Sequence, residues 1–363
     1  MANTLLSRRK LLQNSAAALA GLGLLAGRSG IATACEGVAG GTVRWVVPYR
    51  VGGGFDTYSR LLEPVLEAKL GAEVVVANVV GAGGVVGAKE VRRAPPDGST
   101  LGILNGPSIL ISNLTAAENV PKLGQELDIL ARLARDFDVW ITAAASKVKT
   151  MDDVRRRAGG GRLVFGVARA PGEDWFSCAL GSEFLGFEGK FVTGYEGTGN
   201  AVLAMVRGEF DVTSLSWGSA RQYVESGEAR ALMQVSSAPI ADHPGLADVP
   251  WLCGADGLAA RHARNVNQDV SRASSLATAL SAILAAGRLV VAPPGLDPAL
   301  RNCLGQAVYA SITDPAFIAA ARDAKRPLDP ATGAEALATI QQVAQEAEAL
   351  VPIIRRNLQK TRS

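Results

Sequence analysis

The sequence predicts an α/β protein of two lobes, with parallel-rich sheets flanked by helices. Between Val43 and Leu104, short apolar segments alternate with helical patterns in a β-α-β-α-β order, which implies parallel strands covered by helices. In addition, a strand, a glycine-containing loop and an amphipathic helix follow one another twice, at 43–66 and again at 162–185. Two such units on two facing lobes would form a clamp for a small ligand.

The first unit begins with the strand expected at Val43–Val47 and continues through Pro48, Tyr49 and three consecutive glycines. The helix after it has a single apolar face, formed by Tyr58, Leu61, Leu62, Val65 and Leu66. We expect Asp56 to be its N-cap. Backbone N–H groups in such a loop, beside the positive end of a helix dipole, can bind an anion. Any α/β protein also needs glycine in tight strand-to-helix turns, so this motif alone leaves both interpretations open.

The remaining pattern extends the α/β order along the chain. We expect strands at 73–78, 100–104, 162–167, 190–193, 210–215 and 289–292, and a strand pair within 128–145. We expect helices ending at Val91 and Arg207, a helix capped by Thr150, a helix carrying Phe176, Leu180, Phe184 and Leu185, and two closing helices at 298–313 and 332–355.

A second glycine loop resembles a dinucleotide fingerprint, but its spacing does not fit. Gly81 and Gly83 are correctly placed, whereas the third glycine is Gly87 and the position that requires glycine is Val86. No acidic residue ends a following strand where it could hold a ribose. We therefore expect no dinucleotide and no other cofactor.

The N-terminus has the pattern of an export signal. Ser7–Leu12 is a twin-arginine-like segment, an apolar run covers 16–27, and Ala32-Thr33-Ala34 offers a cleavage site. The run is too short for a comfortable membrane span, so we expect a signal peptide at 1–34 and a periplasmic protein exported by the twin-arginine route. Cys35 directly after Ala34 leaves a lipoprotein anchor open, although no branched residue precedes the cysteine by three positions.

Composition excludes several classes of function. The 363 residues are 48% hydrophobic with a net charge of +3, so we expect no nucleic-acid partner. The chain has two histidines and four cysteines, and no pair has metal-ligand spacing. We expect no metal site and no catalytic residue. A disulfide among Cys178, Cys253 and Cys303 is left open.

Four ordered blocks resemble the solute-binding proteins of tripartite tricarboxylate transporters, the Bug family. The first is Val46-Val47-Pro48-Tyr49 with Gly52–Gly54 and Asp56, and the second is Val76-Ala77-Asn78 with Gly81–Gly84, Gly87, Pro96-Asp97-Gly98 and Thr100-Leu101. The third is Gly194–Gly197 with Arg207–Asp211, and the fourth is Val291–Gly295 with Asp314-Pro315. Each block is weak alone, but their order along 42–358 is fairly specific.

This resemblance implies a periplasmic-binding-protein architecture of type II (Venus-flytrap) and a binding role without catalysis. It implies a protein, expected to be monomeric, that closes on a small carboxylated solute and delivers it to the membrane permease subunits of a tripartite transporter. We expect lobe 1 at 42–145 plus 290–363, lobe 2 at 146–257, and an insertion at 258–289 that carries an extra surface helix of unknown role.

In the family, the first glycine loop holds one carboxylate of the ligand, and the strand-to-helix loop of the second lobe forms the opposite wall. The ligand-binding residues implied or expected here are Tyr49, Gly52, Gly53, Gly54, Asp56, Ser108, Arg169, Ala170, Pro171, Gly172, Glu173, Asp174, Tyr195 and Trp217.

The second-lobe loop departs from the family, because Glu173 and Asp174 replace small hydroxyl residues and glycine. The two acids either favour the helix dipole, or they repel a second carboxylate and meet an amino or hydroxyl group of the ligand. Arg169 could pair with a ligand carboxylate or with Glu173. Trp175 and Trp217 are candidates for the wall of an apolar ligand portion.

Two other functions are left open by the residues. A sensor or adaptor for a signalling partner would use the same closure. An enzyme acting on a small organic acid would need acid–base groups in the cleft, for which Asp56, Glu173 and Asp174 are the candidates.

Overall fold

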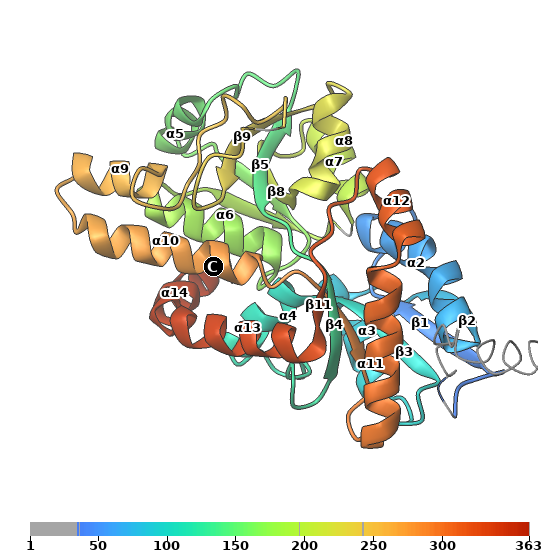
Figure 1. Ribbon diagram of the computed structural model, residues 1–363. Helices are drawn as coiled ribbons and strands as arrows, with labels where there is room; N and C mark the ends of the chain where they lie inside the picture. Colours follow the sequence, from blue (N-terminus) through green and yellow to red (C-terminus); the bar gives the residue numbers. More distant parts are fainter. Residues whose placement is uncertain (1–34, 36, 196, 242, 363) are drawn as a thin grey trace, which may run out of the picture. The chain divides into compact units, whose positions relative to one another are not determined.

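The computed structural model describes residues 35, 37–195, 197–241 and 243–362 (Figure 1). The expected signal peptide at 1–34 lies outside these residues, as does Glu196. The part of the chain that the structure describes contains no helix with both the length and the apolar composition needed to cross a bilayer.

The first sheet has six strands in the order β11-β4-β10-β3-β1-β2. They are β1 (Thr42–Val47), β2 (Glu73–Asn78), β3 (Thr100–Asn105), β4 (Asp128–Ala134), β10 (Arg288–Ala292) and β11 (Ala331–Thr332). β1 pairs in parallel with β2 and with β3, which confirms the expected β-α-β-α-β unit. β10 lies antiparallel to β3 and β4, and β11 lies antiparallel to β4.

Helices cover both faces of this sheet (Figure 1). One face is packed by α2 (Gly54–Leu70), α11 (Pro298–Ile312) and α12 (Pro315–Asp323). The other is packed by α3 (Val85–Arg93), which follows the short 3-10 turn η1 (Ala82–Gly84), and by α4 (Gly106–Leu114) and α13 (Gly333–Glu346). The apolar stripe predicted for α2 faces this core, since Tyr58, Leu62 and Leu66 are fully buried.

The second lobe is built on two small sheets. β5 (Asp138–Ala143) lies between β8 (Thr213–Ser216) and β9 (Ala229–Val235) in an antiparallel sheet, and β6 (Val164–Val167) pairs in parallel with β7 (Lys190–Thr193). Its helices are α5 (Met151–Gly159), α6 (Glu173–Phe184), α7 (Thr198–Val206) and α8 (Trp217–Glu225). Thr150 caps α5 as predicted, within a capping box with Asp153.

The strand pair expected within 128–145 needs a correction. Both strands exist, but β4 bonds to β10 and β11 while β5 bonds to β8 and β9. The chain therefore passes from the first sheet to the second between Ala134 and Asp138, upstream of the lobe boundary expected at residue 145. Periodicity marks a strand but carries no information about its partner.

The segment at 258–289 forms two helices, α9 (Leu258–Asn265) and α10 (Val270–Leu284). The helix expected here has one covered face, because Ala277, Leu280 and Ile283 of α10 are fully buried, whereas Ser271, Arg272, Ser275 and Thr278 are exposed. α10 packs against α6 of the second lobe and against α4 and α13 of the first. The chain ends in η2 (Ala347–Leu350) and α14 (Val351–Arg362), where a single long helix was expected from 332.

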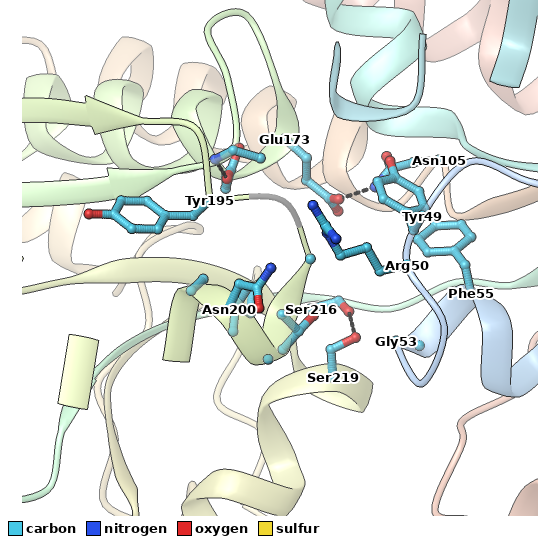
Figure 2. A pocket seen from close by; sticks show the side chains of 18 of the residues that line it. Tyr49, Arg50, Gly53, Phe55, Asn105, Glu173, Tyr195, Asn200, Ser216 and Ser219 are labelled. Carbon is cyan, nitrogen blue, oxygen red and sulfur yellow. Dashed lines mark hydrogen bonds between the residues drawn. The ribbon is translucent and has the colours of Figure 1, made fainter. Parts of the chain in front are cut away.

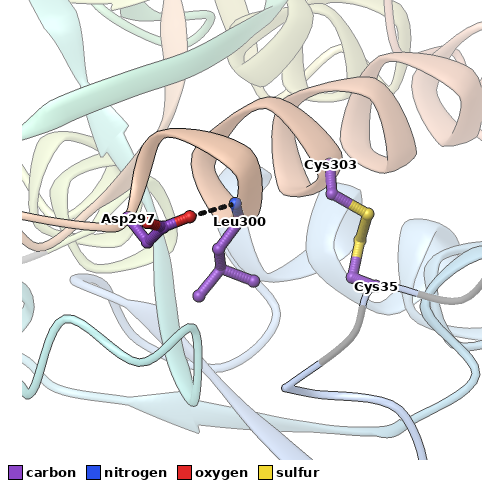
Figure 3. The surroundings of a disulfide bond; sticks show 4 residues. All are labelled: Cys35, Asp297, Leu300 and Cys303. Carbon is purple, nitrogen blue, oxygen red and sulfur yellow. Dashed lines mark hydrogen bonds between the residues drawn. A yellow bond between two sulfur atoms is a disulfide. The ribbon is translucent and has the colours of Figure 1, made fainter.

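Cys35 and Cys303 form a disulfide with a Cα–Cα distance of 5.7 Å. Figure 3 shows that it joins the segment before β1 to α11. Asp297 caps α11 by accepting from the N–H groups of Ala299 and Leu300. Cys178 and Cys253 are free and buried, and burial raises the pKa of both thiols.

Candidate functional site

A cavity of about 270 Å³ lies between loops of the first sheet and loops of the second lobe. Figure 2 shows Arg50 and Phe55 entering from the β1–α2 side, Glu173 and Asn105 at one wall, and Ser216 with Ser219 at another. The volume suits a small organic molecule.

Helices α2, α4, α6, α7 and α8 all begin at this cavity. Their first residues or N-caps that line it are Gly53, Asn105, Gly172, Gly197 and Ser216. Because the first N–H groups of a helix have no acceptor within it, each start presents donors and the positive end of a dipole. The first turns of α2 and α6 contain acidic side chains, and Asp136 accepts from the N–H of Gly218 in α8. The described first turn of α7 contains no acid.

Asp56 is not the N-cap of α2, which corrects the prediction. The N-cap is Gly53, and Asp56 is the third residue of the helix, in its first turn, with 2% exposure. Its carboxylate accepts from the N–H of Gly52 at 2.9 Å and from Asn78 Nδ2 at 3.0 Å. Asn78 Nδ2 also donates to the carbonyl of Tyr49 at 2.9 Å. Asp56 therefore fixes the glycine loop from behind instead of lining the cavity.

Replacement of Asp56 by alanine should loosen this loop. Burial disfavours the charged carboxylate, but hydrogen bonds from Arg60, Gly52 and Asn78 outweigh that effect and lower the pKa of Asp56. Loss of these charged hydrogen bonds should reduce the free energy of unfolding by about 2 kcal/mol at pH 7. Because the folded pKa is depressed, the difference from wild type should shrink as pH falls below about 4. Urea unfolding at pH 7 and pH 3 measures it, with Glu63→Ala on the same helix as the control; an unchanged Asp56→Ala midpoint would contradict this role.

The two acids in the first turn of α6 occupy different environments. Asp174 accepts from the N–H groups of Ala168 and Trp175, so its carboxylate is held by backbone. Glu173 accepts from Asn105 Nδ2, and its own N–H donates to Ser108 Oγ at 3.2 Å. Burial is the largest cause that raises the pKa of Glu173 to about 7 and that of Asp174 to about 6. Glu173 therefore titrates close to neutral pH, whereas Asp174 titrates about one pH unit lower.

Arg169 and Arg326 line the cavity, and Arg288 lines the smaller recess beside it. Arg169 does not pair with Glu173; its Nη2 donates to Ser112 Oγ at 2.7 Å. Arg326 Nη1 donates to the carbonyl of Gly218. Arg288 is 4% exposed, lies over the rings of Phe55 and Tyr58, and donates to Ser216 Oγ at 3.0 Å. Burial lowers the pKa of both Arg169 and Arg326.

A buried polar network lies behind the cavity wall. Ser214 Oγ donates to Asp138 Oδ2 at 3.0 Å and lies 2.8 Å from Ser177 Oγ, and Trp140 Nε1 donates to Ser177 Oγ at 3.2 Å. Burial, followed by the charge of Glu173, raises the pKa of Asp138 well above its usual value. Within the described residues, no group of three histidine, cysteine or acidic side chains is placed to hold a metal ion.

The raised pKa values of these acids predict that the protein loses stability as pH rises. Between the ordinary pKa of a glutamate and a folded pKa of about 7, the folded state binds more protons than the unfolded state. From pH 5 to pH 8, Glu173 alone should cost about 2 kcal/mol of unfolding free energy. Glu173→Gln should reduce that loss in urea titrations at the two pH values, whereas Glu183→Gln at the far end of α6 should not. An equal loss in wild type and Glu173→Gln would rule out this assignment.

Most of the predicted ligand-binding residues meet at the cavity. Those that line it are Tyr49, Gly52, Gly53, Gly54, Ser108, Arg169, Gly172, Glu173, Asp174 and Tyr195. Asp56, Ala170, Pro171 and Trp217 do not line it. Trp217 is 3% exposed and packs against Phe137 and His243. Trp175 is also buried, and its Nε1 donates to Thr361 Oγ1 at 3.0 Å, so neither tryptophan walls the cavity.

Sequence reasoning missed a substantial part of the lining. The missed residues include Arg50, Asn105, Thr198, Asn200, Ser216, Ser219 and Arg326. The glycines around Thr198 resemble those of the first loop, and that pattern could have indicated the start of α7 as a second anion-binding position. Ser216, Ser219 and Arg326 carry no comparable signal in the sequence.

Several solved structures are similar in fold. The periplasmic binding protein BugD aligns with a TM-score of 0.68 and 18% identity over 88% of this chain and 98% of its own. MatC from Rhodopseudomonas palustris, solved with malate, aligns with a TM-score of 0.66 and 20% identity over 86% and 99%. R. palustris Rpa4515, solved with adipate, aligns with a TM-score of 0.63 and 18% identity over 88% and 97%. These likenesses show the two-lobed binding-protein fold.

Several proteins are similar to this chain in sequence. BugT of Bordetella pertussis is 28% identical over 232 residues, which cover 60% of this chain and 68% of BugT. A UPF0065 protein of Pseudomonas sp. strain P51 is 28% identical over 218 residues, which cover 60% of this chain and 63% of that protein, less than two thirds of its length. The model of the tripartite tricarboxylate transporter family receptor matches residues 59–256. The chain belongs to this receptor family.

Proposed function

We propose that this protein is an extracytoplasmic solute-binding protein that closes on a small carboxylated organic solute. It delivers the solute to the membrane permease subunits of a tripartite tricarboxylate-type transporter and does not transform it. The observation that carries the proposal is the convergence of helix starts from both lobes on one cavity, because such starts bind carboxylates.

The β1–α2 loop and the start of α7 are the positions we propose for a ligand carboxylate. Gly53, Gly54 and Phe55 line the cavity at the positive end of α2, and Thr198, Gly199 and Asn200 do so at α7. Ordered waters can complete such a cage. The ligands of two structural neighbours, malate on MatC and adipate on Rpa4515, are dicarboxylic acids of suitable size.

A thermal-shift screen tests the proposal. Mono- and dicarboxylates of two to six carbons, with malate and adipate among them, should include at least one that raises the Tm of the purified protein. At a ligand concentration of about 100 times the Kd, the expected stabilisation is about 2.7 kcal/mol. Amines and sugars of the same size serve as controls. The proposal fails if no carboxylate shifts the transition.

We further propose a periplasmic location, reached by the twin-arginine route and followed by cleavage near Ala34. Thioether attachment of lipid and disulfide formation require the same sulfur of Cys35. The pairing of Cys35 with Cys303 therefore favours a protein without a lipid anchor. Intact-mass measurement of the protein purified from its native membrane and soluble fractions distinguishes the two states.

A sensor or adaptor role uses the same ligand-driven closure, and binding of the closed form to a kinase instead of a permease would favour it. An enzyme would need turnover of a bound acid. The acids at the cavity, Glu173 and Asp174, are held by Asn105 and by backbone N–H groups without a histidine among the lining residues.

We propose that the protein acts as a monomer without cofactor, metal or nucleic acid.

A further inference from the structure

The carboxyl group of Glu173 is a feature of the cavity that the binding of a simple carboxylate does not use. Glu173 is the first residue of α6 and lines both the main cavity and a smaller recess beside it. Figure 2 shows its side chain directed toward Asn105 at the cavity wall. A helix start would normally offer free N–H groups to an anion, but here the N–H of Glu173 already donates to Ser108 Oγ.

The surroundings of Glu173 are rich in other carboxyl groups. Asp174 follows it on α6, Asp136 lies in the β4–β5 connection, and Asp138 lies on β5. Among the described residues, further charged or titratable groups near it are Arg288 from β10, Tyr49 from the β1–α2 loop and Arg50 from the same loop. Arg288 is engaged with Ser216 and lies 3.9 Å from Asp136.

We propose that Glu173 is a specificity-determining residue that accepts a donor group of the ligand, an ammonium group above all, so that the preferred solute carries a carboxylate at one end and an amino group at the other. This inference rests on the proposed carboxylate-binding function. A second carboxylate at this wall would face Glu173 and Asp174 and would require Glu173 to be protonated. An ammonium group would instead form a charge-assisted hydrogen bond with the ionised side chain.

The two ligand classes should respond to pH in opposite directions. Burial, with Asp174 and Asp136 as neighbours, holds the pKa of Glu173 near 7. Below pH 7 an ammonium ligand must displace a proton from Glu173, so its affinity should fall by up to tenfold per pH unit. Above pH 7 a dicarboxylate must take up a proton, so its affinity should fall instead.

The test uses matched pairs of ligands that differ only at the distal group. 6-Aminohexanoate is compared with adipate, and 4-aminobutanoate with succinate, by calorimetric titration of the purified protein at pH 6 and pH 8. We expect at least one amino acid of these pairs to bind more tightly than its dicarboxylate at pH 8, with a smaller advantage at pH 6. Glu173→Gln should weaken binding of that amino acid roughly 10- to 100-fold and abolish the pH dependence.

Glu183→Gln is the matched control, because it neutralises an acid on the same helix outside the cavity. If Glu173→Gln does not fold, the opposite pH trends of the two ligand classes on wild type still test the proposal. Binding of adipate or succinate in preference to the amino acids at both pH values would overturn the inference and leave the proposed function intact. Failure of every carboxylate to bind would overturn the proposed function itself.

Discussion

Replacement of Cys303 by serine should lower the free energy of unfolding by about 2–5 kcal/mol. The disulfide with Cys35 spans 268 residues of sequence, so its loss restores conformational freedom to nearly the whole described chain in the unfolded state. Cys35 is 1% exposed and belongs to the same core as Leu304 and Val308 of α11. Without the bond, the segment before β1 should also lose its covalent attachment to α11. Urea unfolding of oxidised wild type and the variant measures the difference.

Reductant provides the matched control for this prediction. Wild type treated with dithiothreitol should unfold at the midpoint of Cys303→Ser, and the variant should not respond to the reagent. The free thiols of Cys178 and Cys253 are buried with raised pKa values, so they should not contribute. Equal midpoints for oxidised wild type and the variant would show that the bond does not stabilise the fold.

Replacement of Gly54 by valine should abolish or strongly weaken ligand binding. A Cβ atom at this position would lie 2.8 Å from Ser219 Oγ of α8, which also lines the cavity. The larger valine side chain would hold the β1–α2 loop and α8 apart. It would also approach Arg288 Nη2 and Arg326 Nη1, which each lie 3.9 Å from the Cβ position. We expect the Kd of any carboxylate that binds wild type to rise at least tenfold, measured by calorimetric titration.

Gly159→Val serves as the control for this substitution. Gly159 ends α5, and a Cβ there would meet no atom within 4 Å. The Kd of the same carboxylate for the Gly159→Val variant should equal its Kd for wild type. A Gly54→Val variant that is folded by circular dichroism and binds as tightly as Gly159→Val would show that the ligand does not occupy this cavity.

The elements that the sequence predicted best are those with an unambiguous period. α2 was expected from its apolar stripe, and β2 and β7 were predicted with the observed bounds at 73–78 and 190–193. The error at Asp56 arose because an acid near a helix start stabilises it from the first turn as well as from the N-cap. The partners that cover the apolar face of α10 could not be predicted, because its apolar run at 276–286 does not say which neighbours lie against it.

The candidate site was predictable where glycine marks a strand-to-helix turn. The loop at Gly52–Gly54 and the loop at Gly172 both line the cavity. Trp217 was expected there because a large aromatic can wall a ligand, but it packs on Phe137 instead. Arg326 was missed because it reaches the cavity from the connection between α12 and β11, which no local pattern links to a ligand.

A crystal structure of the protein with a carboxylate that raises its Tm tests whether this cavity binds the ligand. Electron density for the ligand should lie in the cavity between the lobes. At least one carboxylate oxygen should lie about 2.7–3.2 Å, directly or through one water, from backbone N–H groups at the start of α2 or α7. Ligand density elsewhere on the protein, or a ligand whose carboxylates meet neither helix start, would contradict the account.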